Sequence, residues 1–152
     1  MRAALALLVA ATALAAGCGG DDAGSPESVV RAWSTALNEG DDEAAARLFA
    51  EGATVVQGGF YATLPTRETA VAFNASLPCS GEIIALRVED DQVIATFLLG
   101  DRPTSACDGP GERATALFVV AEGKIVLWQQ VPTPGGAAPE DVPPAGDEAP
   151  AV

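Results

Sequence analysis

The stretch VVRAWSTALNEGD, from Val29 to Asp41, decides how the chain begins to fold. Four of its apolar residues recur at the spacing of one helical face, namely Val29, Val30, Trp33 and Leu37. Just upstream, Ser25 is a good N-cap and Pro26 suits the first helical position. Gly40 is typical of the left-handed residue that ends a helix. The pattern therefore predicts an amphipathic helix that begins near Ser25 and stops at Gly40.

A second helix is expected directly after the first. Asp41 can cap it, and Asp42 and Glu43 favour its positive end. Gly52 is expected to close this helix. Its expected apolar face consists of Ala45, Leu48 and Phe49.

Turn residues then divide the chain into a strand, a turn and a third helix. The segment TVVQ at 54–57 predicts a short strand, and the glycine pair at 58–59 marks a turn before the aromatic pair at 60–61. Thr66 can cap the third helix. The expected apolar face of that helix consists of Ala70, Phe73 and Leu77.

Two hairpins are predicted in the second half of the chain. Residues 82–88 and 92–99 flank the acidic turn EDD, and residues 113–121 and 124–131 flank a Glu-Gly turn. The loop at 100–111 connects the two hairpins. Helices first and antiparallel strands afterwards indicate the α+β fold class. A sheet with helices on one face must curl around them, and such a curl can enclose a pocket.

The stretch LAAGCGGDD, from Leu14 to Asp22, indicates where the protein works. Arg2 precedes an apolar run, Ala3 to Ala16, that is shorter than the roughly 20 residues a membrane-spanning helix needs and is typical of an export signal. The small residues before Cys18 resemble a bacterial lipobox, in which the cysteine is diacylated and becomes the new N-terminus. The alternative is an ordinary secretory peptide, cut after the triplet 13–15.

The composition predicts four parts along the chain. They are a lipoprotein signal peptide at 1–17, a spacer at 18–24, one globular domain at 25–131 and a tail at 132–152. The tail is mainly Pro, Gly, Ala and acidic residues, which predicts disorder. We expect the protein to be lipid-anchored through Cys18 at the extracytoplasmic face of the cell membrane.

Charge and cysteine count limit the partners and the compartment. The chain has 8 basic and 21 acidic residues, a net charge of −13, which repels nucleic acid and anionic head groups alike. Membrane attachment is therefore expected through acyl chains. With Cys18 lipidated, Cys79 and Cys107 remain as a pair, which outside the cytoplasm predicts a disulfide. The alternative is two unrelated buried thiols.

Three segments in order carry a family resemblance. Val29–Asp41, AARLFAEGATVV at 45–56 and FVVAEGKIVLWQQV at 118–131 together resemble the nuclear transport factor 2-like superfamily, in its SnoaL-like branch. The resemblance implies a cone of three N-terminal helices packed on a curved antiparallel sheet. This fold hosts isomerases, cyclases, hydrolases, transport factors and non-catalytic modules, so the fold does not give the function.

The first two segments also look like those of ketosteroid isomerases. Those enzymes use an Asp general base and an oxyanion hole made of a Tyr and a protonated Asp. The resemblance places the Tyr at Trp33, the base at Gln57 and the second acid near Thr115 or Ala116. Glutamine cannot take up a proton at neutral pH, and an indole N–H is a weaker donor than a phenol. The resemblance therefore argues against isomerase chemistry.

The absence of histidine excludes several kinds of site. A sequence without histidine has no Ser-His-Asp or Cys-His catalysis and no histidine metal site. Neither a cofactor nor a metal is expected. Among the acids, Asp101 and Asp108 lie in the loop that carries Cys107 and could face the mouth of a cavity.

Aromatic and amide side chains indicate a pocket. The candidates to line it are Trp33, Gln57, Tyr61, Phe73, Trp128 and Gln130. For the aromatic residues the alternative is an ordinary core. We expect a non-catalytic module that binds a small apolar ligand or a protein partner in or around a cone-shaped pocket. The alternatives are an enzyme of the isomerase, cyclase or hydrolase type, and a subunit that forms homodimers through the outer face of the sheet.

Overall fold

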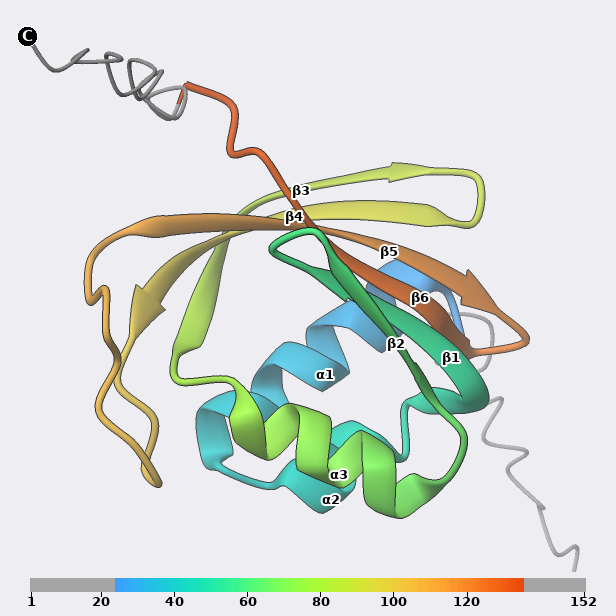
Figure 1. Ribbon diagram of the computed structural model, residues 1–152. Coiled ribbons are helices and arrows are strands. Elements are labelled where there is room, and N and C mark those ends of the chain that lie inside the picture. The colour runs from blue at the N-terminus through green and yellow to red at the C-terminus, as the bar shows by residue number, and fades with distance from the viewer. Residues whose placement is uncertain (1–23, 136–152) are drawn as a thin grey trace, which may run out of the picture.

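A curved sheet of six strands wraps around helices on its inner side (Figure 1). The computed structural model describes residues 24–135. The elements in chain order are α1 (Pro26–Glu39), α2 (Asp42–Ala46), β1 (Phe49–Gln57), β2 (Phe60–Leu64), α3 (Arg67–Ser76), β3 (Ser80–Glu89), β4 (Gln92–Gly100), β5 (Arg113–Ala121) and β6 (Lys124–Val131). The predicted signal peptide, Cys18 and most of the predicted tail lie outside the described residues.

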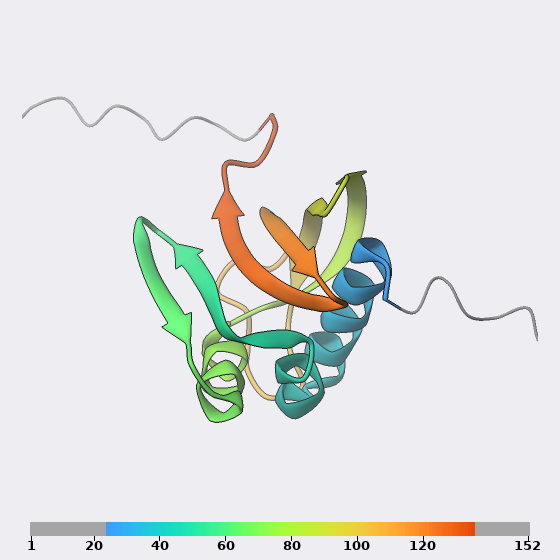
Figure 2. The same ribbon diagram turned by 90° about the vertical axis from the view of Figure 1, so that its right-hand side faces the viewer.

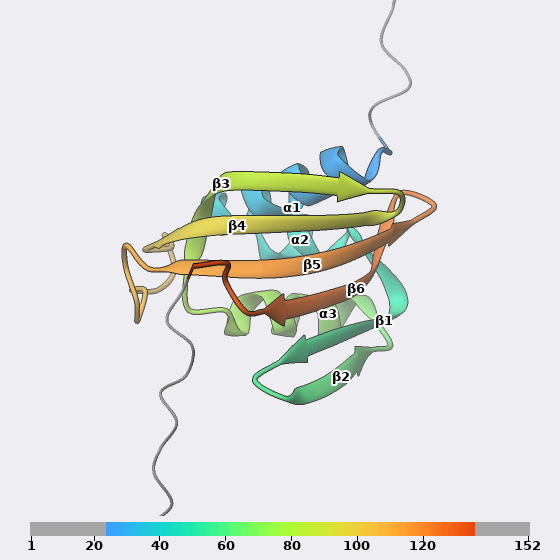
Figure 3. The same ribbon diagram turned by 90° about the horizontal axis from the view of Figure 1, so that it is seen from above.

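The sheet joins the first strands to the last ones. Its order is β2-β1-β6-β5-β4-β3, and the view from above follows the strands in that order (Figure 3). All neighbours pair antiparallel except β1 and β6, which run parallel. The expectation of a wholly antiparallel sheet is therefore wrong. The parallel pair joins two strands that are far apart in sequence. The residues of a strand do not indicate whether the neighbouring strand runs parallel or antiparallel to it.

Helix α1 forms as its sequence predicts. The Ser25 hydroxyl accepts a hydrogen bond from the Ser28 backbone N–H at 3.3 Å, and Gly40 ends the helix at φ +73°. The four expected apolar residues are buried, and the side view shows α1 beside the inner face of the sheet (Figure 2).

Helix α2 is shorter than expected. Asp41 caps it, accepting from the Ala44 N–H at 2.8 Å, but the helix ends at Ala46. Phe49 already belongs to β1, and Gly52 lies inside that strand at φ +77°, where the pairing with β6 changes register. The prediction that Gly52 ends a helix is wrong because the neighbouring β6 draws this segment into the sheet. Its Ile125 N–H donates to the carbonyl of Leu48 at 2.8 Å.

The third helix does not precede the sheet. Helix α3 follows the β1–β2 hairpin, so the expectation of three N-terminal helices is corrected to two, with a third between β2 and β3. Thr66 and Thr69 form a capping box at its start. At this positive helix end, hydrogen bonds from the backbone N–H of Glu68 and from the Thr66 side chain hold the pKa of the Glu68 carboxyl below its usual value.

An aromatic cluster forms the core between the helices and the sheet. Trp33 meets Phe118 and Phe97 edge-on, with ring centroids 5.2 and 6.2 Å apart. Phe73 of α3 lies 5.2 Å from Trp128 in the same way. Edge-to-face pairs add about 0.5–1.5 kcal/mol each beyond the burial of their area. The core therefore ties α1 and α3 to the same sheet, and both helices meet at Trp128 of β6.

No helix within residues 24–135 is long and apolar enough to cross a membrane.

Candidate functional site

A cavity of about 280 Å³ opens between α1, the inner face of the sheet and the segment that joins α3 to β3. The volume lies just below the roughly 300–1,000 Å³ of typical small-molecule pockets. The lining comes from six parts of the chain. The lining residues are Trp33, Ser34, Leu37, Asn38, Gln57, Leu77, Pro78, Cys79, Ser80, Gly81, Phe97, Leu99, Asp108, Glu112, Ala114, Thr115, Ala116, Trp128 and Gln130.

The floor of the cavity is apolar and aromatic. Trp33 and Leu37 come from α1, Phe97 from β4 and Trp128 from β6. All four are buried side chains of the core. The cavity is thus continuous with the aromatic cluster.

A buried amide fixes the orientation of Trp33. The Trp33 Nε1–H donates to Asn74 Oδ1 at 2.9 Å, and the Asn74 amide donates to the carbonyl of Ala70 at 2.8 Å. Asn74 is fully buried. A buried indole N–H needs an acceptor, and the Asn74 side chain of α3 supplies it. Asn74 is therefore a positioning residue for the cavity floor.

A buried arginine holds this helix end in place. Arg102 Nη1 donates to the carbonyls of Asn74 and Leu77 at 2.7 and 2.9 Å, and Nη2 donates to Asp42 Oδ1 at 2.5 Å. The Arg102 side chain has no exposed area, whereas that of Asp42 is partly exposed. A cation at a helix C-terminus also favours the helix dipole. Through these contacts the loop between β4 and β5 is joined to both α2 and α3.

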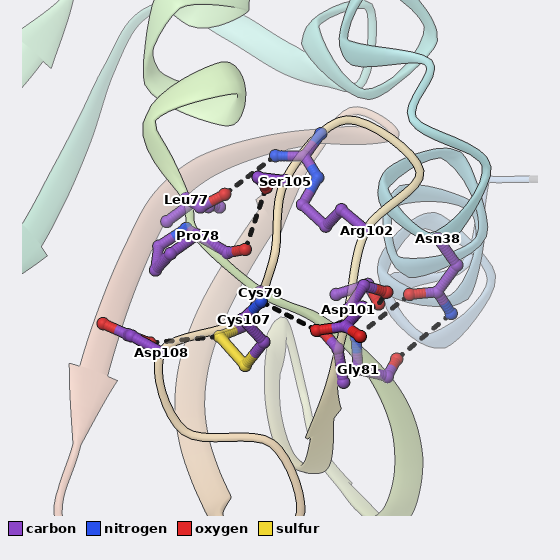
Figure 4. Close-up of a disulfide and its surroundings, with 12 residues drawn as sticks. Asn38, Leu77, Pro78, Cys79, Gly81, Asp101, Arg102, Ser105, Cys107 and Asp108 are labelled. Carbon is purple, nitrogen blue, oxygen red and sulfur yellow. Dashed lines mark hydrogen bonds between the residues drawn. A yellow bond between two sulfur atoms is a disulfide. The ribbon is translucent and has the colours of Figure 1, made fainter.

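A disulfide closes the mouth of the cavity. Cys79 and Cys107 are bonded, as the sequence predicts, and join the segment after α3 to the loop between β4 and β5 (Figure 4). The carboxylate of Asp101 accepts from the Cys107 N–H at 2.9 Å. Asn38 of α1 reaches the same region, where it exchanges two hydrogen bonds with the backbone of Gly81. The mouth is therefore built from crosslinked backbone.

Two carboxylates line this mouth. Asp108, one of the two acids expected there, is a lining residue, and one of its oxygens lies 3.2 Å from the Cys79 sulfur. Glu112 lines it as well. Asp101, the other expected acid, does not, because its side chain turns to the backbone of its own loop. None of the lining residues is a lysine or an arginine.

Amide and hydroxyl groups complete the polar part of the lining. Gln57 stands at the end of β1 and Gln130 near the end of β6, and both are exposed residues that line the cavity. Thr115 is buried, and its hydroxyl lies 3.0 Å from that of Thr96. The positions matched to an isomerase base and second acid are thus occupied by an amide, Gln57, and by the neutral Thr115 and Ala116, all of which line the cavity.

Two of the six pocket candidates lie elsewhere. Phe73 is part of the core, between Trp128 and Phe49. Tyr61 is 81% exposed on β2, where it pairs with Val56. Side chains alternate along a strand. Because the adjacent Val55 points into the core, Tyr61 points to the outer side. The other four candidates, Trp33, Gln57, Trp128 and Gln130, line one cavity.

Sequence reasoning missed three residues of this region. Asn74 lies among apolar neighbours at the 70, 73 and 77 spacing, which was a signal for a buried polar contact. Arg102 and Glu112 stand in a loop without periodicity, and no local pattern marks either of them. One buried donor of the floor, Trp128 Nε1, has no hydrogen-bond partner among the described residues.

The same region offers little to a metal ion. Cys79, Cys107 and Asp108 place their ligand atoms within 4.8 Å of one another. Thiolates bind metals, and the two sulfurs here are bonded to each other instead. That leaves one carboxylate, so this cluster does not fit a metal site in its oxidised form.

Known proteins share this fold. The family model described as "SnoaL-like domain" matches residues 30–128. No curated protein sequence matches the chain. A nuclear transport factor 2-like protein of unknown function from Cytophaga hutchinsonii superposes with a TM-score of 0.59 at 15% identity, over 70% of this chain and 88% of that chain.

Two further solved structures carry names that suggest a function. A putative polyketide cyclase from Sinorhizobium meliloti has a TM-score of 0.55 at 19% identity, over 68% of this chain and 93% of that chain. A protein from Catenulispora acidiphila with a ketosteroid isomerase-like fold, solved in complex with trimethylamine, has a TM-score of 0.56 at 21% identity, over 72% and 87%. At these identities the likeness is one of fold alone.

Proposed function

The chain belongs to the SnoaL-like domain family, and from this premise we propose that its cavity binds a small, largely apolar molecule without transforming it. The observation that carries this proposal is the composition of the floor. Its deepest residues, such as Trp33, Phe97 and Trp128, carry no titratable group. A general base or acid must exchange protons near the working pH, and no floor residue can do so.

The polar groups are placed as in a binding site. A few hydrogen-bonding side chains around an apolar pocket orient a ligand and give specificity. Gln57 and Gln130 stand at the rim in this chain, while the disulfide crosslinks the mouth. The site is therefore largely formed before a ligand enters, which lowers the entropy that binding must overcome.

Intrinsic fluorescence tests this proposal directly. Trp33 and Trp128 are the two tryptophans of the chain, and both line the cavity. A small apolar ligand should change the emission of the full-length protein and raise its melting temperature. Ala114→Leu fills the cavity from β5. It should raise the dissociation constant of the ligand at least ten-fold, which corresponds to about 1.4 kcal/mol of binding free energy.

The matched control is Ala85→Leu, which adds the same group on an exposed position of β3. It should leave the affinity unchanged. Equal binding by the two variants would place the ligand outside the cavity. A chemically diverse set of apolar molecules that changes neither emission nor melting temperature would contradict the binding function itself.

An enzymatic role is the second candidate, and Asp108 with Glu112 is the observation in its favour. These carboxylates line the cavity from its mouth, where a substrate could reach them, and a neighbour of the same fold is called a putative polyketide cyclase. Turnover of a bound compound that Asp108→Asn or Glu112→Gln abolishes, while binding persists, would establish this role. Binding without turnover supports the non-catalytic module.

We also propose that the protein is anchored outside the cytoplasm through Cys18. The support is the order of apolar run, small residues, cysteine and polar spacer. Metabolic labelling with a fatty-acid analogue should mark the wild type, and Cys18→Ser should remove the label and the membrane association. Protein released into the medium and cut after Ala15 would contradict the anchor.

The outer face of the sheet supports a further proposal, the formation of homodimers. Ile94 and Leu117 pair across β4 and β5 on that face, and Leu98, four residues further along β4 on the same face, is 39% exposed. Apolar sheet surface of this kind marks many protein interfaces. Sedimentation should then report a dimer that Leu117→Glu dissociates, and a monomer at all concentrations would contradict it.

A further inference from the structure

We propose that the ligand of the cavity is an organic cation, a tertiary or quaternary ammonium group with an apolar body. This inference rests on the proposed binding function and adds the charge of the ligand. Its basis is a combination of two features in one cavity, an aromatic floor and a rim whose charged groups are all negative.

The charges of the rim have one sign. Asp108 and Glu112 are the charged residues that line the cavity. The next residue, Arg113, starts β5 and pairs with Leu98 on the outer face. Glu112 and Ala114, the residues on either side of it, both line the cavity, whereas Arg113 does not. The nearest basic side chain in sequence therefore does not neutralise the mouth.

Both carboxylates lack a cationic partner. Within residues 24–135 the ion pairs are Arg31–Glu27, Arg87–Glu89 and Arg102–Asp42. Lys124 donates to the carbonyl of Arg47 at the other end of the sheet. A cavity lined by one sign of charge raises the local concentration of counter-ions, and the domain as a whole has more acidic than basic residues.

The aromatic floor selects among cations. The rings of Trp33 and Trp128 lie 6.5 Å apart and are tilted by 53°, and Phe97 lies 6.2 Å from Trp33. A cation over an aromatic face is attracted by the ring quadrupole, and tryptophan is the strongest of the aromatic partners. Rings of this kind hold quaternary ammonium groups in other binding sites.

Hydrogen bonding argues for a substituted ammonium group over a primary one. A primary ammonium has three N–H donors, and burying them without acceptors is costly. The buried lining is mainly rings and alkyl groups, and its two buried hydroxyls, Ser34 and Thr115, already bond to the Gly81 carbonyl and to Thr96, while the carboxylates stay at the rim. A methylated ammonium group can lie against the rings without unmet hydrogen bonds and still be attracted by the rim.

The test compares two probes of one shape. Benzyltrimethylammonium carries the charge, and neopentylbenzene replaces its nitrogen with carbon. Titration into the full-length protein, followed by tryptophan emission, should give the cation at least a ten-fold higher affinity. A higher salt concentration should weaken the binding of the cation and leave the binding of the neutral probe unchanged, because salt screens the exposed carboxylates.

Variants then assign the effect to the rim. The double variant Asp108→Asn, Glu112→Gln should lower the affinity for the cation about ten-fold and leave that of neopentylbenzene unchanged. The control, Glu51→Gln with Asp91→Asn, removes the same charge from two exposed acids that do not line the cavity. It should have little effect on either probe.

The outcomes separate the two proposals. Equal affinity for both probes, or equal loss in the rim and control variants, would overturn the cationic ligand while binding stands. Tighter binding of the neutral probe would overturn it as well. Failure of both probes and of every other apolar molecule to bind would overturn the binding function and this inference together.

Discussion

The polar groups beneath the cavity and those at its mouth are used differently. Beneath the floor, Arg102 donates hydrogen bonds to the Asp42 carboxylate and to the carbonyl of Asn74. The Asn74 side chain in turn accepts a hydrogen bond from Trp33 Nε1. At the mouth, Asp108 and Glu112 have no ion pair within the described residues. Both groups consist of ordinary side chains within one small fold. The difference is that the first set, apart from Arg102 Nε, makes its hydrogen bonds within the protein, whereas the second is left for solvent or a ligand.

This contrast separates stability from binding. A buried polar group without its partner costs about 1–3 kcal/mol, and a buried charge costs more, so the lower network holds the fold. Exposed carboxylates contribute little to folding because water solvates them in both states. Changes beneath the floor should therefore destabilise the fold, whereas changes to the carboxylates of the mouth should alter binding and leave stability almost intact.

The largest effect is expected from Arg102→Ala. It removes two bonds to the end of α3 and leaves Asp42 without its partner, so the free energy of unfolding should fall by about 3–5 kcal/mol in urea denaturation. The control is Arg31→Ala, which removes an exposed pair with Glu27 and should cost less than about 1 kcal/mol. Similar losses in the two variants would remove the distinction between the regions.

The second-largest loss of stability is expected from removing the disulfide, because this bond crosslinks the mouth. Cys79→Ser with Cys107→Ser opens a loop with a sequence separation of 28, which in the chain-entropy model costs about 3.5 kcal/mol. Reductant should destabilise the wild type by a similar amount and leave the double variant unaffected. The bond would be disproved if the wild type, denatured without reductant, had two titratable thiols in addition to Cys18.

Asn74→Ala sharpens the comparison at the point where the network meets the cavity. The Trp33 N–H loses its acceptor, so stability should fall by about 1–3 kcal/mol and the tryptophan emission should shift. Asn38→Ala, which removes two exposed bonds to Gly81, is the control and should cost less. An unchanged emission in Asn74→Ala would show that Asn74 does not position the ring.

The smallest effect on stability is expected at the mouth. Asp108→Asn and Glu112→Gln, alone or together, should change the free energy of unfolding by less than about 0.5 kcal/mol, because both residues are exposed and without ion pairs. Chemical denaturation measures this. A loss above that of Asn74→Ala would mean that the acids serve the fold and are not reserved for a ligand.

Local patterns were enough for most elements, and their failures have physical causes. Helix α1, the caps of all three helices and both late hairpins follow from periodicity and capping residues close together in sequence. The end of α2 did not, because Phe49 is apolar in either structure and pairing with β6 decided between them. The same parallel pair makes the sheet mixed, and a strand's own residues do not specify the direction of a distant neighbour.

The candidate site divides in the same way. The sequence by itself determined the residue types: aromatic rings, amides, an excess of acids, no histidine and a cysteine pair that forms a disulfide. Only the tertiary structure decided which of them meet. It turned Tyr61 outward by the alternation of a strand, packed the partly buried Phe73 against the core and brought Glu112 to the mouth. It also buried Arg102 beneath the floor, because a charge so far from its partners in sequence finds them only when the loop folds back onto two helices.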